Sequence, residues 1–387
     1  MNPEPTDKLQ SQAPLREIAR EFLRLGFIAF GGPAAHIALM EEEFVRRRKW
    51  VTRERFLDLV GAVSLLPGPS STELAIYLGQ IRGGFLGLIV AGAAFILPAA
   101  ILVVGLAWAY VRFGAVPEVA GLLFAVKPVV VVLIAQAIWV LGKAALRTVP
   151  LAAMAILVVA LSAFGVPALI LLIGAGMVCM LAREVQTIGA RKTTVAAVLA
   201  RVIRFSAPAV VAGLSSVFLY FLKVGVVLFG SGYVLLALLR ADLVVRLHWL
   251  TELQLLDAIA VSQATPGPFF TVSTFIGYLL GGWRGAILAT IGMFLPAFVY
   301  VAATANFLPR LRKSKAASAF LDGVNAAALA LMAFVGWQFA RAAIASVPAV
   351  ILAAITVVLV FRYRVNSAWV IAVAALAGIL LGFFHVN

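Results

Sequence analysis

The chain has few charged residues, three histidines and a single cysteine. Charged residues make up 12% of its 387 positions, about half of their share in an ordinary soluble domain. One cysteine, Cys179, excludes a disulfide scaffold, and we interpret it as a buried packing thiol. The histidines lie far apart in sequence, and no GxxxxGK[ST] string is present. We therefore expect no metal, no cofactor and no intrinsic nucleotide site.

Hydrophobic residues are abundant instead, at 64% of the chain. They fall into apolar stretches of about 18 to 28 residues, and a helix needs roughly 20 to cross a bilayer. The net charge of +15 fits basic cytoplasmic loops better than nucleic-acid binding. The sequence predicts an all-α polytopic protein of the lipid bilayer with about 10 to 13 membrane segments.

The chain contains an internal repeat. The string FLRLGFIAFGGP from Phe22 is matched by FLKVGVVLFGSG from Phe221, and the register continues through Pro67-Gly68-Pro69 against Pro266-Gly267-Pro268. After one residue is dropped, the pairing extends to Pro150 and Pro348. We expect an N-terminal repeat at 1–182, a basic cytoplasmic linker at 183–204 and a C-terminal repeat at 205–387.

Matched loops of the two halves carry different charge. The loop after the first segment is strongly basic in the first half and weakly basic in the second, whereas the next major loop shows the reverse. Because cytoplasmic loops collect Lys and Arg, this reversal indicates an inverted-topology repeat with a midplane site, as in many secondary transporters. The Pro-Gly-Pro regions are expected to dip in and out. Whether Leu15–Met40 crosses or bends back stays open.

Gly/Pro interruptions mark where helices should break inside apolar sequence. An open backbone within a bilayer is tolerated only where protein or a water-filled cavity satisfies it, so matched breaks predict a binding site. Helices starting after them would offer N–H groups to an oxyanion. The alternative is packing kinks and N-caps without a ligand. The predicted substrate-binding residues are Gly31, Gly32, Pro33, Pro67, Gly68, Pro69, Ser70, Ser71, Thr72, Gly230, Pro266, Gly267, Pro268 and Thr271.

Charged residues within apolar spans add candidates, because such charges are costly. Lys127 and its repeat mate Asn325 complete the predicted substrate site as an asymmetric, net-positive centre; the alternative is a lysine that snorkels to the interface. Glu73, whose repeat mate is the apolar Val272, is the candidate for proton coupling. The alternative is that Glu73 pairs with a structural arginine such as Arg82. The matched Asp58 and Asp257 favour a salt bridge at a helix start or loop.

These motifs resemble the chromate ion transporter family in its long, two-domain form. The resemblance rests on FIAFGGPAAHI from Phe27, LLPGPSSTELAIYLG from Leu65, RGG from Arg82 and the second-half strings FGSG and ATPGP. It implies a multi-pass protein of the bacterial cell inner membrane that exports chromate, energised by the proton motive force, and confers chromate resistance. The second half departs from the pattern at Gly230-Ser231-Gly232, which lacks the proline.

Several alternatives stay open. Chromate and sulfate are both tetrahedral dianions, so import or exchange of sulfate or another oxyanion on the same fold is the alternative function. An enzyme would need convergent catalytic groups, and the sequence offers only isolated polar residues, so no enzyme is expected. Paired inverted halves favour alternating access over a channel. The sequence leaves open the coupling ion, including protons, and a homodimer.

Overall fold

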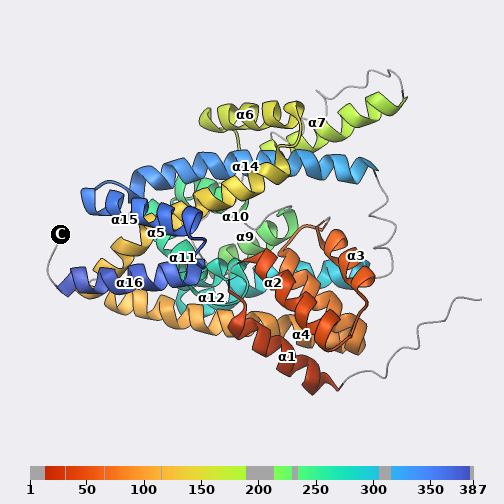
Figure 1. Ribbon diagram of the computed structural model, residues 1–387, viewed down its shortest axis with the longest axis horizontal. Helices are drawn as coiled ribbons and strands as arrows, with labels where there is room; N and C mark the ends of the chain where they lie inside the picture. Colours follow the sequence, from red (N-terminus) through yellow and green to blue (C-terminus); the bar gives the residue numbers. More distant parts are fainter. Residues whose placement is uncertain are drawn as a thin grey trace, which may run out of the picture.

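The computed structural model describes residues 14–30, 32–64, 66–114, 116–188, 213–228, 234–304 and 315–383. All regular structure in these ranges is helical (Figure 1). Within these ranges, four helices are long and apolar enough to cross a membrane. They are α4 (Ser70–Phe113), α5 (Pro117–Ala145), α12 (Val272–Thr304) and α14 (Lys315–Ala343). Together with shorter apolar helices in both halves, they confirm the predicted all-α polytopic membrane fold.

Both repeats open with the same succession of elements. The first half has α1 (Leu15–Ile28), α2 (Pro33–Met40), a π-helix (Glu41–Arg47), α3 (Arg53–Val63) and α4. The second has α9 (Leu214–Val227), α10 (Val234–Leu239), a π-helix (Arg240–Arg246), α11 (Glu252–Ala264), a 3-10 turn (Phe269–Thr271) and α12. Even the left-handed residue after each π-helix is matched, at Lys49 (φ 54°) and His248 (φ 51°). Matched sequences therefore adopt matched local structure.

The segment left open by the sequence bends back. Ile18, near the start of α1, lies beside Gly83, whereas Gly26, near its end, packs against Phe95 and Pro98 of α4. The chain then breaks and returns through α2 and the π-helix, so that Arg48 forms an ion pair with Glu21 of α1 at 2.6 Å. Leu15–Met40 is thus a hairpin of two short helices rather than a single crossing.

Each Pro-Gly-Pro lies at the tip of a second hairpin, formed in the first half by α3 and the first part of α4 and in the second half by α11 and the first part of α12. Gly83 and Gly84 interrupt α4 with non-helical dihedral angles, and Gly79 before this turn packs directly on Gly87 after it. The Arg82 guanidinium lies 5.5 Å from the Trp50 ring, which precedes α3. The first part of α4 therefore returns to the side where α3 began. Gly281 and Gly282 make the equivalent turn in α12.

The matched helices α4 and α12 run antiparallel to each other. Tyr77, early in α4, hydrogen-bonds with Thr304 at the end of α12, and Gly92 packs against Phe298. Tyr110, late in α4, stacks its ring edge on Phe275 near the start of α12, at 5.3 Å between centroids. Opposite directions of repeat-related helices are the structural signature of the inverted topology that the sequence predicted.

The remaining helices of each half pack on those of the other half. They are α6 (Val149–Ala163) and α7 (Ala168–Ile188) after α5, and α15 (Val347–Val357), a π-helix (Val358–Arg362) and α16 (Ser367–Phe383) after α14. Helix α5 packs on α15 and α16, α14 packs on α6 and α7, and α5 and α14 contact each other. One large core of buried aliphatic and aromatic side chains joins these helices to α9–α12.

Candidate functional site

The broken segments of the two halves cross and hydrogen-bond to each other. The N–H of Gly68 donates to the Leu228 carbonyl at 2.6 Å, and the N–H of Gly267 donates to the Ala29 carbonyl at 2.8 Å. Gly68 is the repeat mate of Gly267, and Ala29 is the mate of Leu228. Each Pro-Gly-Pro tip is therefore joined to the first break of the opposite half. Both tips and the residues Ala29 and Leu228, which precede the first breaks, therefore meet in one region.

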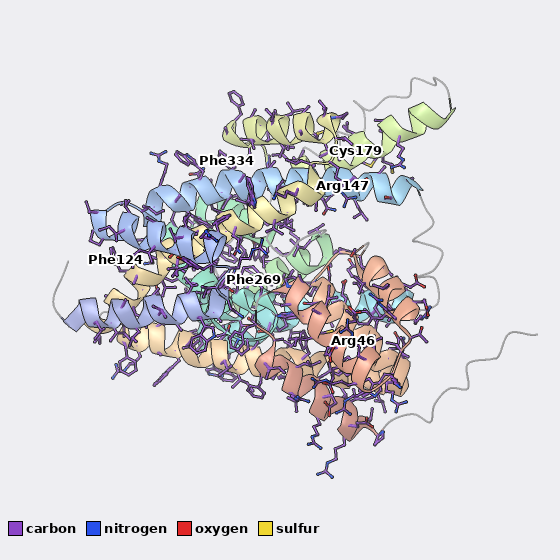
Figure 2. The ribbon with its side chains drawn as sticks, in the orientation of Figure 1. Arg46, Phe124, Arg147, Cys179, Phe269 and Phe334 are labelled. Carbon is purple, nitrogen blue, oxygen red and sulfur yellow. The ribbon has the colours of Figure 1, made fainter. Side chains whose placement is uncertain are left out.

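Glycine is required at both tips by conformation and by space. Gly68 has φ +135° and Gly267 has φ +96°, values that residues with a Cβ rarely adopt. A Cβ at Gly68 would lie 2.6 Å from Oε1 of Glu73, and one at Gly267 would lie 2.7 Å from Cβ of Ala99. The neighbouring prolines have no N–H and stop the helices on either side. Phe269, which follows the second tip, lies in the middle of the molecule (Figure 2).

His36 joins the first break to the start of α4. Its Nε2 lies 3.1 Å from the Ala29 carbonyl and its Nδ1 lies 3.2 Å from Oγ of Ser71. A carbonyl only accepts, so Nε2 carries the proton, and in the neutral ring Nδ1 accepts from the Ser71 hydroxyl. The histidine is 1% exposed. His36 therefore links the backbone before the first break to Ser71, a predicted site residue.

Thr72 and Thr271, which follow the two tips, are both buried, but their bonding differs. Thr271 donates to the Pro268 carbonyl at 2.9 Å, within its own turn. Thr72 is fully buried, and its hydroxyl has no partner within the described ranges. The backbone N–H groups of Thr72 and Glu73 donate to the Pro69 carbonyl. The start of α4 thus keeps an unused buried hydroxyl, and the start of α12 does not.

Glu73 is a buried carboxyl group beside the Pro67-Gly68-Pro69 tip, in the first turn of α4. Its exposure is 0%, and neither carboxyl oxygen has a hydrogen-bond partner among the residues that the structure describes. Arg82, the alternative partner suggested by the sequence, lies over the Trp50 ring instead. A buried polar group without a partner is costly, and a buried unpaired charge is far more so. Glu73 is therefore the most unusual titratable group of the site.

Lys127 is paired with a carboxylate of the other half. Its Nζ lies 3.1 Å from Oδ1 of Asp257 in α11, and the Tyr110 hydroxyl donates to Oδ2 at 3.0 Å. The lysine and aspartate side chains are 16% and 4% exposed. The sequence indicated a salt bridge for Asp257 at a helix start or loop but did not identify its partner. In this conformation Asp257 neutralises the positive charge expected from Lys127.

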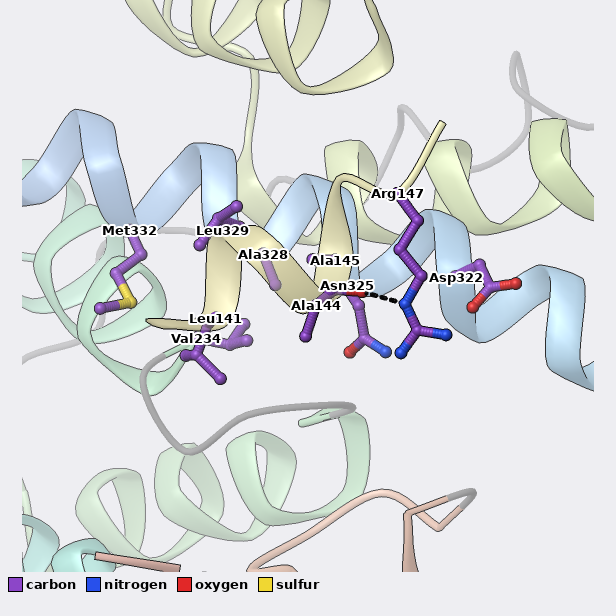
Figure 3. A pocket seen from close by; sticks show the side chains of 10 residues that line it. All are labelled: Leu141, Ala144, Ala145, Arg147, Val234, Asp322, Asn325, Ala328, Leu329 and Met332. Carbon is purple, nitrogen blue, oxygen red and sulfur yellow. Dashed lines mark hydrogen bonds between the residues drawn. The ribbon is translucent and has the colours of Figure 1, made fainter. Parts of the chain in front are cut away.

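Asn325, the repeat mate of Lys127, lines a cavity of about 200 Å³ between α5, α10 and α14. Arg147 and Asp322 are the charged lining residues, and Leu141, Val234, Leu329 and Met332 make much of the apolar wall (Figure 3). Nε of Arg147 donates to the Ala144 carbonyl at 2.7 Å, which leaves its terminal N–H groups directed at the cavity beside Asn325. The mates Lys127 and Asn325 therefore have different surroundings.

Two predicted site residues, Gly31 and Gly230, lie outside the described residues, as does most of the predicted linker at 183–204. Gly32 has φ +82° and precedes Pro33, which begins α2. Pro67, Pro69, Ser70, Pro266 and Pro268 belong to the two tips described above. Asn325 is a member of the separate cavity rather than of the crossing.

Comparison with known proteins identifies this architecture. The family model for the chromate transporter matches residues 16–181 and again residues 215–379. The chain belongs to the chromate transporter family. The two matched stretches correspond to the two repeats, so the protein is a long-chain member and a multi-pass transporter. No solved structure matches the chain.

Relatives of similar length support this assignment. A chromate transport protein of Cupriavidus metallidurans is 31% identical over 380 residues, covering 95% of this chain and 93% of the relative. A chromate transport protein of Pseudomonas aeruginosa is 34% identical over 384 residues, covering 94% and 92%. The transporter YwrB of Bacillus subtilis is 36% identical over 134 residues, covering 35% of this chain and 68% of YwrB, as expected for a match to one repeat.

Proposed function

We propose that this member of the chromate transporter family is a secondary transporter that exports chromate across a bacterial inner membrane, is energised by the proton motive force and confers chromate resistance. The observation that carries the proposal is the crossing of the broken segments at Gly68 and Gly267. Matched broken helices at the interface of inverted repeats are where secondary transporters bind their substrates. The names of the full-length relatives point to chromate as the substrate.

The start of α4 supplies groups that suit an oxyanion. Ser70 and Ser71 begin its first turn, where N–H groups without an intrahelical acceptor and the helix dipole favour negative charge. The buried Thr72 hydroxyl has no partner in the described part of the chain and is available to a ligand. Glycine at position 68 keeps side-chain bulk away from this turn. We propose that chromate binds here, between the crossed segments, with Thr271 of the second half opposite.

The direction of transport follows from charge and membrane potential. Moving one charge through the potential is worth about 2.3 kcal/mol per 100 mV. A dianion that leaves a negative interior therefore gains about 4.6 kcal/mol per 100 mV, twice the single-charge value. Export of chromate is thus favoured by the potential alone, and exchange for protons adds the proton gradient.

Glu73 is the proposed proton carrier. A carboxyl group without a partner is stable in a buried site in its neutral, protonated form. It becomes stable as an anion only when water or a cation reaches it, which happens when the crossed segments open. Oε1 of Glu73 lies against Gly68, so the loss or gain of charge on Glu73 changes the electrostatic potential at the substrate site. A proton is therefore bound in one conformation and released in another.

The test is uptake of radiolabelled chromate into everted vesicles that contain the protein, with and without a proton gradient and with sulfate as competitor. Gradient-driven accumulation is expected. Glu73→Gln keeps the shape of the side chain and should abolish the effect of the proton gradient while chromate exchange across the membrane continues. Strong competition by sulfate would shift the proposal to a general oxyanion transporter.

Glu54→Gln serves as the matched control, because Glu54 is exposed on α3 of the same half; its uptake should equal that of the unmodified protein. Absence of any chromate accumulation in vesicles that contain folded protein contradicts the export proposal. Full proton dependence in Glu73→Gln contradicts the coupling role.

A further inference from the structure

We infer that Asp257 is a positioning residue that withholds Lys127 from substrate in the present conformation, and that in the opposite conformation Asp58 takes the equivalent place beside Asn325. The inference rests on the proposed transport function and concerns how the two halves exchange roles. It starts from a difference between helices that the repeat makes equivalent.

The second hairpins of the two halves are packed differently. Helix α11 packs against α5, α14 and α16 as well as α12, whereas its mate α3 packs mainly against α4 and its own π-helix. Leu256 on α11 is 0% exposed, whereas its mate Leu57 on α3 is 49% exposed. Figure 1 shows α11 inside the molecule and α3 at its periphery. The local folds of the halves are equivalent, but their positions are not.

Such asymmetry is expected of one state of a two-state inverted repeat. In the opposite state the halves exchange environments, so that α3 packs against α14 as α11 packs here against α5. Repeat mates then exchange contacts. Asp257 has the mate Asp58, and Lys127 has the mate Asn325. The contact between Lys127 and Asp257 in this state therefore becomes a contact between Asn325 and Asp58 in the other.

The two contacts differ in strength. Asp257 has both a lysine at 3.1 Å and the Tyr110 hydroxyl at 3.0 Å. Asp58 would meet the neutral amide of Asn325. The buried ion pair favours the present state, because a neutral amide cannot replace a cation beside a carboxylate.

Release of Asp257 from Lys127 has a direct consequence for substrate. In the opposite state the Lys127 ammonium loses its protein counter-charge and needs an anion. A ligand shifts an equilibrium only through its different affinity for the two states. A dianion that pairs with Lys127 stabilises the state in which Asp257 has left. Asp257 and the oxyanion therefore compete for the same cation, which links substrate binding to the exchange of the halves.

Thiol cross-linking tests the exchanged contact without requiring chromate transport. In a Cys179→Ser background, Lys127→Cys with Asp257→Cys reports the present contact, and Asp58→Cys with Asn325→Cys reports the predicted one. A short bifunctional methanethiosulfonate is applied to membranes. Asp58→Cys with Asp257→Cys is the control, because neither state brings those positions together. Both reporter pairs should cross-link, and the control should not.

The positioning role is tested by neutralising the ion pair. The Asp58→Cys, Asn325→Cys variant is also prepared with two further substitutions, Lys127→Asn and Asp257→Asn. Together they remove the contact that favours the present state without leaving a buried lone charge. The rate of cross-linking should rise about tenfold, since a tenfold change in population follows from a modest loss of bias. Gel filtration of the detergent-solubilised protein confirms that each variant is folded.

Two results would overturn the inference. One is that the folded Asp58→Cys, Asn325→Cys variant fails to cross-link under conditions in which the Lys127→Cys, Asp257→Cys variant does cross-link. The other is an equal rate with and without the ion pair, because Asp257 would then not bias the equilibrium. If chromate uptake fails but the exchanged cross-link forms, the proposed function is wrong and the exchange of halves stands.

Discussion

The N–H of Gly68 donates to the carbonyl of Leu228 at 2.6 Å, and this bond ties the tip of a hairpin in the first half to the broken segment of the second. The equivalent bond from Gly267 reaches Ala29. In apolar surroundings an unpaired backbone carbonyl is costly, so the breaks of one half are stable only in the presence of the other. The duplication therefore provides each half with the partner that its broken helices require.

Replacing Gly68 by alanine should destabilise the protein strongly. The left-handed conformation alone costs a residue with a Cβ about 1–2 kcal/mol, and the added methyl group would also displace the buried Glu73 carboxyl group. Thermal unfolding in detergent should show a clear loss of stability together with loss of transport. Gly105→Ala is the control within α4, because its Cβ would meet nothing within 4 Å; it should be neutral or slightly stabilising. Equal behaviour of the two variants would contradict the requirement for glycine at the tip.

Arg48 should be essential for the first hairpin. Partial burial lowers the pKa of Arg48, but its hydrogen bond to Glu43 and the charges of Glu21, Glu43 and Glu17 raise it above its usual value. The guanidinium thus stays charged and holds the returning chain to α1. Arg48→Met leaves Glu21 buried without this cation and should cost about 3 kcal/mol of unfolding free energy.

Arg46→Met is the matched control for Arg48, since the Arg46 side chain is 66% exposed and forms a surface pair with Glu42. Such surface pairs contribute about 0–1 kcal/mol. Denaturant unfolding of both variants measures the difference. A loss at Arg46 as large as that at Arg48 would show that general basic charge, rather than the buried network, stabilises the hairpin.

Arg147 should increase the apparent affinity for chromate by attracting the anion to the cavity beside Asn325, on its path to the proposed binding site at the crossed segments. Its terminal N–H groups suit a tetrahedral oxyanion, for which arginine is a geometrically matched partner. Arg147→Ala should raise the chromate concentration for half-maximal uptake about tenfold, with little change in the maximal rate. Arg284→Ala, which removes an exposed arginine that stacks on Trp283, should leave both values unchanged. An unchanged half-saturation in Arg147→Ala would exclude the cavity from the substrate path.

Much of the architecture could be predicted from the sequence. Hydrophobic length and composition determine that the chain spans a membrane, because the bilayer core accepts only helices with their backbone groups paired. The repeat, the reversal of loop charge and the matched Gly/Pro breaks are also properties of the chain itself. They predicted antiparallel mates, which the contacts of α4 and α12 confirm. The two Pro-Gly-Pro tips were found for the same reason, since proline and glycine act on the local backbone.

Other features were decided by the tertiary structure, because they depend on which distant side chains meet. Lys127 looked like an isolated positive charge, but α11 brings Asp257 to within 3.1 Å of it. Glu73 had a plausible partner in Arg82, but the fold places that arginine over Trp50, and among the described residues the carboxyl group has no hydrogen-bond partner. The sequence makes α3 and α11 equivalent, and only packing buries one and exposes the other. Local patterns determine where helices form and break, whereas charge pairing and the choice between two nearly equivalent packings arise from contacts across the whole molecule.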